Sequence, residues 1–347
     1  MRTRTTLFLL VSISTLLVTC IDQVDLPIRT EEPRLVVEGQ ITNEAPPYTV
    51  RLTYTGKYGG TNGQSINDQY VKEAQVTIAD DQNRSTRFVS VGQGLYRTTD
   101  STFRGQVGRA YSLTVVLADG KRYVTKSERM PAVPVIDSIS STLVKTGNLT
   151  IPYAFSYGIN TNDPANEQNY YRWSAYGYTT RLSVGVPCSL GNPSKCNYRC
   201  WTPVSNDVVN IYSDEAINGN PLRNRFVLQV PIYAIGPQLV EVQQFGMTQT
   251  NYQFWKLYQQ QNARTGSIFD PLPAPVTGNL VNASDPTDLA RGYFAVTSVT
   301  RRRYRQQNYP NVVFYSALVS FISSQIIPDG DCRNTYGNVP IIEPEGW

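Results

Sequence analysis

The chain contains no histidine. Catalytic sets that need an imidazole near neutral pH, such as Ser-His-Asp triads and Cys-His pairs, are therefore excluded, as are histidine-ligated zinc sites. The sequence also lacks a glycine-rich phosphate loop and a dinucleotide-binding fingerprint. We therefore predict no catalytic residue, no metal and no cofactor, and we expect the protein not to be an enzyme.

Carboxylate pairs are the acid–base chemistry that stays open without histidine, because a glycoside hydrolase needs only two carboxyl groups about 5–10 Å apart. The candidate pairs are Asp80/Asp81, Asp214/Glu215 and Asp285/Asp288. Most of them stand in turn-like surroundings, and adjacent residues on a strand point to opposite faces. We interpret them as solvated turn carboxylates and keep a carboxylate-pair glycosidase as an alternative.

An excess of charge of one sign is also missing. The formal net charge is +4, from 31 basic and 27 acidic residues. Arg2 and Arg4 lie in a segment that we expect to be removed, which leaves 29 basic against 27 acidic residues, or +2. So small a surplus argues against a nucleic-acid partner and against a polybasic membrane clamp.

Residues 1–19 have the features of a signal peptide. Arg2 and Arg4 form the charged start, and residues 7–18 form an apolar run of the length of an h-region. The run ends in Leu-Val-Thr-Cys, which resembles a bacterial lipobox with Thr19 where Gly, Ala or Ser is usual. We therefore predict a lipoprotein whose lipidated N-terminus is Cys20.

Lipid on Cys20 would hold the protein to the outer membrane, because two or more acyl chains anchor a protein stably. Residues 20–33 read as a polar tether. Within it, Asp22 and Asp25 resemble the acidic residues close to the lipid that direct Bacteroidota lipoproteins to the cell surface. We expect a surface-exposed outer-membrane lipoprotein, with a periplasm-facing orientation as the alternative.

Four cysteines remain after Cys20 is assigned. An even number in an exported protein indicates two disulfides, with three connectivities open. A four-thiolate zinc site is the alternative, since the spacing between the second and third cysteines is close to that of zinc ligands. The oxidising compartment favours disulfides. The four residues are Cys188, Cys196, Cys200 and Cys332.

Residues 34–131 show short strand patterns separated by turn signals. Tyr48–Tyr54 alternates apolar and polar side chains, and Asp119-Gly120 is a two-residue hairpin signal. About seven such strands within about 100 residues indicate a β-sandwich. The pattern resembles Ig-like and transthyretin-like (carboxypeptidase-regulatory-like) domains. Met130–Pro134 is expected to be a stiff joint to the next domain.

Residues 132–347 are predicted to form a larger, β-rich domain of the sandwich type that carries one aromatic helix near 250–264. Its strand patterns include Tyr170–Leu182, Gly292–Thr300 and Val312–Phe321. In the first of these, Tyr171 and Trp173 fall on one face, and Arg172, Tyr176 and Tyr178 fall on the other. The whole chain is therefore expected to be mainly β.

The helix prediction rests on spacing. Phe254, Leu257, Tyr258 and Gln261 fall at i, i+3, i+4 and i+7, with Trp255 beside them. Thr250 or Asn251 is expected to cap its start and Gly266 to close its end. The stripe is interpreted as a packing face that covers a sheet. An aromatic platform for a sugar or a peptide is the alternative.

Aromatic and basic residues supply the candidates for a ligand- or partner-binding surface. The arginines form one cluster that suits phosphate groups or an acidic partner. The alternative interpretation is a charged strand end that discourages edge-to-edge pairing. The candidates are Trp173, Tyr176, Tyr178, Trp201, Trp255, Arg301, Arg302, Arg303 and Arg305.

Two short patterns resemble the Asp-Ser/Thr-apolar acceptor for O-glycosylation in Bacteroidota. They are centred on Ser101 and Ser138. Three-residue patterns also arise often by chance, so both serines are kept as candidate modification sites.

A set of motifs in fixed order gives a more specific resemblance. It covers the mature chain and is similar to the domain-of-unknown-function family numbered 4249, which consists of Bacteroidota lipoproteins. The resemblance implies an outer-membrane lipoprotein, in many cases encoded near a TonB-dependent transporter, and it implies no catalytic residue. The motifs after Cys20 are Leu35–Gly39, Tyr252–Trp255, Gly266–Pro271, Pro273–Asn279 and Gly292–Phe294.

Three functions follow as hypotheses. We favour a non-catalytic accessory lipoprotein that docks on a TonB-dependent transporter, an integral outer-membrane β-barrel, or on another outer-membrane assembly, and that helps to capture a glycan or peptide ligand. The first alternative is a stand-alone glycan-binding or adhesive module. The second is the carboxylate-pair glycosidase.

Overall fold

The structure is a computed structural model of the chain. It describes residues 32–56, 69–165, 167–189, 192–206, 208–216, 218–263, 276–307, 315–328, 330–337 and 339–347, without the side chains of 185–198. The predicted signal peptide, the lipidated Cys20 and nearly all of the tether lie outside the described residues. So do Gly266 and most of the Gly266–Asn279 motif region.

The fold is mainly β, as predicted. Within the described ranges, one ten-stranded sheet has the order β16-β7-β6-β3-β4-β5-β2-β1-β17, with β8 beside β6. We call this sheet the first unit. Its strands are β1 Leu35–Ile41, β2 Thr49–Tyr54, β3 Ala74–Asp80, β4 Ser85–Gly92, β5 Leu95–Thr98, β6 Ala110–Leu117, β7 Arg122–Thr125, β8 Glu128–Arg129, β16 Leu280–Asn282 and β17 Arg291–Val296.

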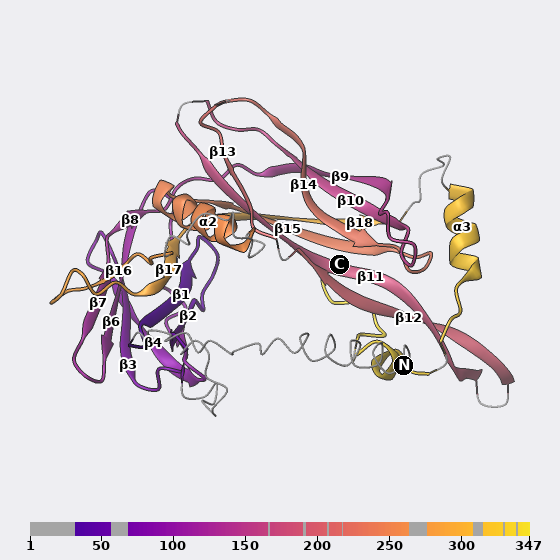
Figure 1. Cartoon of the computed structure of the whole chain (residues 1–347), viewed down its shortest axis with the longest axis horizontal. Helices are drawn as coiled ribbons and strands as arrows, with labels where there is room; N and C mark the ends of the chain where they lie inside the picture. The colour runs from indigo at the N-terminus through magenta and orange to yellow at the C-terminus, as the bar shows by residue number, and fades with distance from the viewer. Residues whose placement is uncertain are drawn as a thin grey trace, which may run out of the picture.

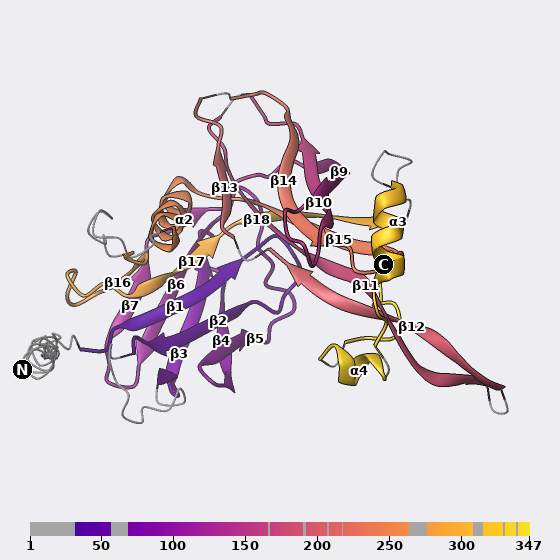
Figure 2. The ribbon, with the colours of Figure 1, turned by 45° about the vertical axis from the view of Figure 1, so that its right-hand side comes forward.

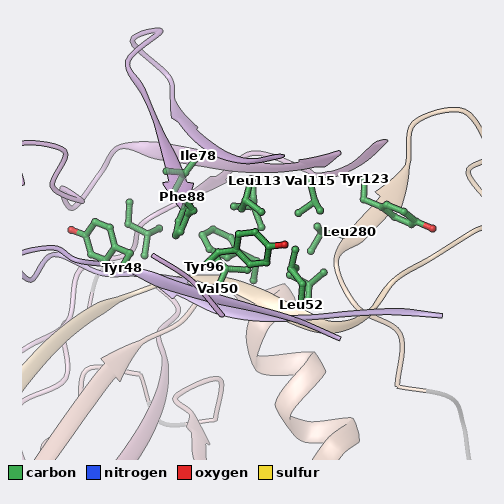
Figure 3. Close-up of a cluster of buried hydrophobic side chains, with 14 of the residues drawn as sticks. Tyr48, Val50, Leu52, Ile78, Phe88, Tyr96, Leu113, Val115, Tyr123 and Leu280 are labelled. Atoms are coloured by element: carbon green, nitrogen blue, oxygen red, sulfur yellow. The ribbon is translucent and has the colours of Figure 1, made fainter. Parts of the chain in front are cut away.

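The strands of the first unit alternate between buried and partly exposed residues, which is why the sheet can fold over its own apolar face. In β6 every second side chain is buried. Figure 3 shows these side chains meeting between two layers of strands, with Val50 and Leu52 below and Leu113 and Val115 above. Leu280 of β16 belongs to the same sandwich-like core and is fully buried in it.

Two strands reach the first unit from far along the chain. β17 pairs with β1 in parallel, with Val36 opposite Arg291 and Ile41 opposite Val296. The alternating pattern of Gly292–Thr300 predicts one strand of the second domain. In the structure the segment is divided at Thr297, and residues on either side of it belong to different sheets. The edge of β1 opposite β2 is thereby satisfied by a strand about 250 residues away in sequence, which no local pattern reveals.

The second unit, as we call it, consists of a three-stranded sheet, β14-β10-β9, and a five-stranded sheet, β12-β11-β15-β18 with β13 beside β11, counted over the described residues. Side chains from both sheets share one buried cluster that includes Phe155, Tyr157 and Trp173. The strands are β9 Ile136–Lys145, β10 Tyr153–Thr161, β11 Tyr170–Ser189, β12 Asn192–Ser205, β13 Asn210–Ser213, β14 Leu222–Pro231, β15 Gln238–Gly246 and β18 Ser298–Gln306.

The predicted aromatic helix is present as α2, Gln249–Asn262. Its N-cap is Thr248, whose hydroxyl accepts a hydrogen bond from the Asn251 amide at 3.2 Å. The cap therefore lies before both predicted residues, because the Thr250 hydroxyl is engaged elsewhere and Asn251 is buried. Figures 1 and 2 show α2 between the two units, against β17 and near the start of β11.

The prediction of a strand over Val312–Phe321 is wrong. Tyr315–Ser324 is a helix, α3. Leu318, Phe321 and Ile322 are spaced three and four apart, so one helical face packs them onto the core of the second unit, where Leu318 is 0% exposed. A short apolar run has no period long enough to separate helix from strand, and the tertiary contact decides.

One predicted disulfide is present. Cys200 of β12 is bonded to Cys332, which begins the short helix α4, Cys332–Thr335. The bond joins residues 132 apart in sequence and ties the C-terminal segment to β12. Cys188 and Cys196 lie on the β11–β12 hairpin, where the side chains are outside the described part of the structure.

Candidate functional site

A pocket of about 380 Å³ lies where α2 meets both units. Its walls come from β1 and β17 of the first unit, from β11 of the second unit, and from α2 with the residue that precedes its cap. It is lined by Glu38, Gly39, Gln40, Arg172, Met247, Asn251, Phe254, Trp255, Tyr258, Gly292, Tyr293, Ala295 and Thr297.

The aromatic side of the pocket belongs to α2. Phe254 packs on Tyr293 with ring centroids 5.0 Å apart, and Trp255 meets Phe254 and Tyr258 edge-on at 5.6 Å each. The predicted stripe contained Leu257 rather than Trp255, but Leu257 is 38% exposed. The face that contacts the rest of the protein is therefore rotated toward Trp255, so the helix presents rings to a pocket as well as packing on a sheet.

Arg172 projects from β11 to the pocket. Its guanidinium carbon lies 4.4 Å from the ring centre of Phe245 and 4.8 Å from that of Trp255. Burial lowers the pKa of Arg172 from 12.5 to about 10, so the side chain is still a cation at neutral pH. Among the described residues, no carboxylate forms an ion pair with it and no hydrogen bond is made by its guanidinium. It is thus a half-buried cation whose charged group stacks on two rings without a counter-ion among the described residues.

Asn251 supplies a second unsatisfied polar group. The residue is 2% exposed, and its side-chain oxygen has no hydrogen-bond partner among the described residues. Buried amide oxygens are nearly always hydrogen-bonded, because leaving one unpaired costs about 1–3 kcal/mol. Two residues of the pocket lining therefore carry polar groups without a partner among the described residues: the acceptor of Asn251 and the cation of Arg172.

A hydrogen-bonded cluster holds α2 against the first unit. Glu128 of β8 accepts hydrogen bonds from the hydroxyls of Thr248, Thr250 and Tyr293, at 2.8, 2.9 and 2.7 Å. Burial, followed by the negative charge of Glu128, raises the pKa of Tyr293. The phenol thus stays protonated and donates. This cluster fixes the first turn of α2 and hence the position of Asn251.

Two of the predicted binding residues are in the interior. Trp173 and Trp201 are each 2% exposed. The indole of Trp173 donates to the Gln244 side-chain oxygen at 2.8 Å, and its ring packs in the core of the second unit. Both tryptophans are large apolar side chains that the sheets bury, so neither belongs to a surface that a ligand could reach. Trp255 is the predicted aromatic that reaches the pocket.

Tyr176 and Tyr178 lie on the face of β11 opposite Trp173 and are partly exposed. Burial, and then a hydrogen bond to Glu241, raise the pKa of Tyr176. Neither tyrosine lines the pocket under α2. The structure therefore does not bring these two predicted residues together with Trp255.

The predicted arginine cluster lies on β18, an edge strand of the five-stranded sheet. Arg301 and Arg303 both bind the Glu241 carboxylate, which is 1% exposed, at 2.8 and 2.7 Å, and Arg301 also pairs with Glu44. Arg305 pairs with Glu343, and Arg302 donates to the carbonyl of Ile136. These engaged guanidiniums fit the protected-edge interpretation rather than a free phosphate-binding surface.

The two candidate glycosylation serines differ in access. Ser101 is exposed in a bend. Ser138 in β9 is partly buried, and its hydroxyl accepts a hydrogen bond from the Asn160 side chain at 2.8 Å. Ser101 is therefore the more accessible acceptor.

The structure brings Asp214 beside Asp163, a pairing that no sequence pattern indicates. Asp214 is 1% exposed and Asp163 is 8% exposed. Burial, and then the neighbouring Asp163, raise the pKa of Asp214. Tyr171 donates to Asp163 at 2.5 Å, so the pair belongs to the buried polar interior of the second unit. By contrast, Asp285 is exposed and accepts a hydrogen bond from a backbone amide in a turn, as expected. Asp80 also accepts hydrogen bonds from backbone amides in a turn, but its side chain is 0% exposed and pairs with Arg84 and Arg109, so it is not the solvated carboxylate that was expected.

The described ranges contain no group of three or more histidine, cysteine, aspartate or glutamate side chains placed to hold a metal ion. Within the same ranges, no helix has the length and apolar character needed to cross a bilayer.

Arg172 and Asn251 were not predicted as site residues. Arg172 stands within the aromatic run Tyr-Tyr-Arg-Trp of 170–173, and a cation placed among rings is a signal that could have drawn attention to it. Asn251 was predicted only as a cap. Nothing in the sequence shows that these two residues meet across α2 and β11.

Comparison with known proteins identifies a family but no activity. The family described as "Domain of unknown function (DUF4249)" matches residues 21–303. No curated protein matches the chain. A solved structure of a DUF4785 family protein from Legionella pneumophila is 8% identical, with a TM-score of 0.17, and the match covers 60% of this chain and 52% of that one. A likeness so low carries no argument about fold or function.

Proposed function

Since this chain belongs to the DUF4249 family, we propose that it is a non-catalytic outer-membrane lipoprotein that binds a ligand in the pocket under α2. In this proposal it serves as an accessory subunit of a TonB-dependent transporter or of another outer-membrane assembly. The observation that carries the proposal is the pocket itself. Its lining includes Arg172, a half-buried cation with ring contacts and no ion pair among the described residues, and Asn251, whose buried side-chain oxygen has no partner there.

The groups on the pocket walls suit binding. Rings, a guanidinium and a carboxamide can hold a ligand through stacking and hydrogen bonds, but none of them is poised to transfer a proton at neutral pH. The described lining includes one carboxylate, Glu38, whereas glycoside hydrolysis uses two, about 5–10 Å apart. This composition supports capture of a ligand over its hydrolysis.

The sequence supports the membrane part of the proposal. The lipobox-like run ending at Cys20 predicts an acylated N-terminus, and the tether that follows gives the two units reach from the bilayer. Labelling of cells with an alkyne-tagged palmitate tests this part. Incorporation that is lost in Cys20→Ala is expected, and an unlabelled wild-type protein would contradict the lipid anchor.

Isolation from native outer membranes tests the accessory role. The tagged protein is purified in mild detergent, and proteins that elute with it are identified by mass spectrometry. We expect an integral outer-membrane protein in stoichiometric amount. A wild-type protein that elutes alone would refute the docking part.

A stand-alone glycan-binding module is the second candidate, and one observation favours it. Tyr258 is 40% exposed on the pocket, where a sugar ring can stack. The same isolation separates the two functions. A protein without a membrane partner that still binds glycans, and loses them when Ala295→Phe fills the pocket, would be such a module.

A further inference from the structure

We propose that the pocket under α2 recognises a carboxylate. Arg172 is the anion-binding residue, and the Asn251 side-chain oxygen accepts a hydrogen bond from an O–H or N–H group next to that carboxylate. The inference rests on the proposed binding function and names the chemical class of its ligand.

Arg172 differs from most of the other stacked or paired arginines of the described structure. Arg181, which stacks on Tyr233 and Tyr336, likewise has no ion pair among the described residues, but it lies at a smaller pocket of about 150 Å³. Arg301 and Arg303 meet the carboxylate of Glu241, and Arg225 donates to the Asn210 side chain while it lies over Trp173 and Tyr212. Arg172 has ring contacts alone. Arg172 is half-buried, so its guanidinium is partly desolvated and still open to a ligand in the pocket, and an anion that pairs with it there would stabilise the cation.

The geometry suits a planar anion. Stacking on Phe245 and Trp255 fixes the plane of the guanidinium, at 4.4 and 4.8 Å from the two ring centres. The N–H groups lie in that plane, and two parallel N–H donors match the two oxygens of a carboxylate. Because the rings hold the plane in advance, little rotamer freedom remains to be lost on binding.

Asn251 adds a second requirement. Asn251 lines the pocket, and its side-chain oxygen is buried without a donor among the described residues. A ligand that brings a hydroxyl or amide hydrogen satisfies it, whereas a simple fatty acid does not. The backbone of Asn251 is held in place because its N–H donates a hydrogen bond to the hydroxyl of the cap residue Thr248. That hydroxyl in turn donates a hydrogen bond to the Glu128 carboxylate.

The remaining lining sets the size and the charge of the ligand. A volume of about 380 Å³ is at the small end of the roughly 300–1,000 Å³ range for ligand sites, which suits a single residue or an end group. The rings of Trp255, Tyr258 and Tyr293 offer apolar faces to its body. The carboxylate of Glu38 on the same pocket disfavours a dianion such as a phosphate ester.

Two small ligand types share this chemistry. A uronic acid residue carries a carboxylate, neighbouring hydroxyls and a stacking face. The C-terminal residue of a peptide carries a carboxylate, an amide N–H and a side chain. The experiment therefore compares galacturonate with galactose, and N-acetylphenylalanine with its amide, on the full-length lipoprotein in detergent. Binding is measured by isothermal titration and by the change in tryptophan fluorescence.

We expect one acid to bind at least about 30-fold more tightly than its neutral counterpart. Arg172→Met should lower its affinity to that of the neutral compound, and Arg172→Lys should restore only part of it, since Lys lacks the planar fork. Asn251→Leu should weaken binding by about 3- to 10-fold. Arg225→Met, which removes a stacked arginine away from the pocket, should leave the affinity unchanged. Which acid binds identifies the source of the carboxylate.

Two results would overturn the inference, and they separate it from the proposed function. If the neutral compounds bind as well as the acids and only Ala295→Phe abolishes binding, the pocket is a binding site but not for carboxylates. If neither acid binds the wild-type protein at millimolar concentration, the carboxylate inference falls. The proposed function would also fall if, in addition, native outer-membrane preparations of the wild-type protein and of Ala295→Phe carried the same bound small molecules.

Discussion

Replacing Arg172 with methionine is expected to stabilise the ligand-free protein. Burial lowers the pKa of Arg172 from 12.5 to about 10, which means that folding disfavours the cation. Because the folded-state pKa lies below the unfolded-state value, this cost is fully present below about pH 10 and disappears only as the pH rises toward 12.5. At about 1.4 kcal/mol per pH unit, it corresponds to about 3 kcal/mol at neutral pH.

The ring contacts act in the opposite direction. Each cation–π contact, with Phe245 and with Trp255, stabilises the folded state by about 0.5–2 kcal/mol. Methionine at position 172 would keep part of this stabilisation, because its sulfur packs favourably on aromatic rings. The net expectation for Arg172→Met is an increase of about 1 kcal/mol in the free energy of unfolding, together with loss of carboxylate binding.

Urea denaturation at pH 7, followed by circular dichroism, measures this change against a matched control. Arg225 also stacks on two rings, but it donates hydrogen bonds to the Asn210 side chain and to the Ile211 carbonyl. Arg225→Met should therefore destabilise by about 1–3 kcal/mol, because it leaves partly buried acceptors unpaired. If Arg172→Met destabilised the protein as much as Arg225→Met does, Arg172 would be a structural residue and the reasoning would be refuted.

Three further perturbations test other parts of the structure. Cys332→Ala, which opens the loop closed by the Cys200 bond across 132 residues, should destabilise by about 4 kcal/mol in denaturation under non-reducing conditions; a change below about 1 kcal/mol would show that the bond does not constrain the unfolded chain. Glu241→Gln should destabilise by about 2 kcal/mol or more near pH 7, because its two arginines lose their shared anion. The pKa of Glu241 is lowered by those partners, so this difference should fade as the pH falls through the folded-state pKa, and a pH-independent difference would argue against the ion pairs. Asp214→Asn should stabilise the protein near pH 7 and raise its melting temperature. Burial raises the pKa of Asp214 above 3.8, so ionisation of this carboxyl group opposes folding at neutral pH. A lower melting temperature of the variant would show that the charge of Asp214 is needed.

Much of the β architecture is readable from local pattern. The alternation in Tyr48–Tyr54 became β2, and the hairpin signal at Asp119-Gly120 joins β6 to β7. The aromatic spacing near 250–264 became α2. These features depend on neighbours two to four residues apart, and a sequence displays those neighbours directly. The same logic failed for Tyr315–Ser324, where a short apolar run fits either period.

The candidate site depended on contacts that no local pattern contains. The parallel pairing of β17 with β1, in which Gly39 lies opposite Phe294, forms one wall of the pocket. The sequence pattern assigned Arg172 only to one face of a strand. Its candidate role as a binding residue became visible from the packing of Trp255 of α2 against its guanidinium.

The sequence by itself determined the mainly β composition, the absence of imidazole chemistry, the one long aromatic helix and the pool of cysteines from which Cys200 and Cys332 pair. Only the tertiary structure decided which sheet each late strand joins, which tryptophans are buried, and that Arg172 stacks on two rings without a counter-ion among the described residues. The physical reason is the distance in sequence over which each effect acts. Secondary-structure propensity and hydrophobic periodicity depend on residues a few positions apart, whereas burial and charge pairing depend on segments that come into contact only when the chain folds.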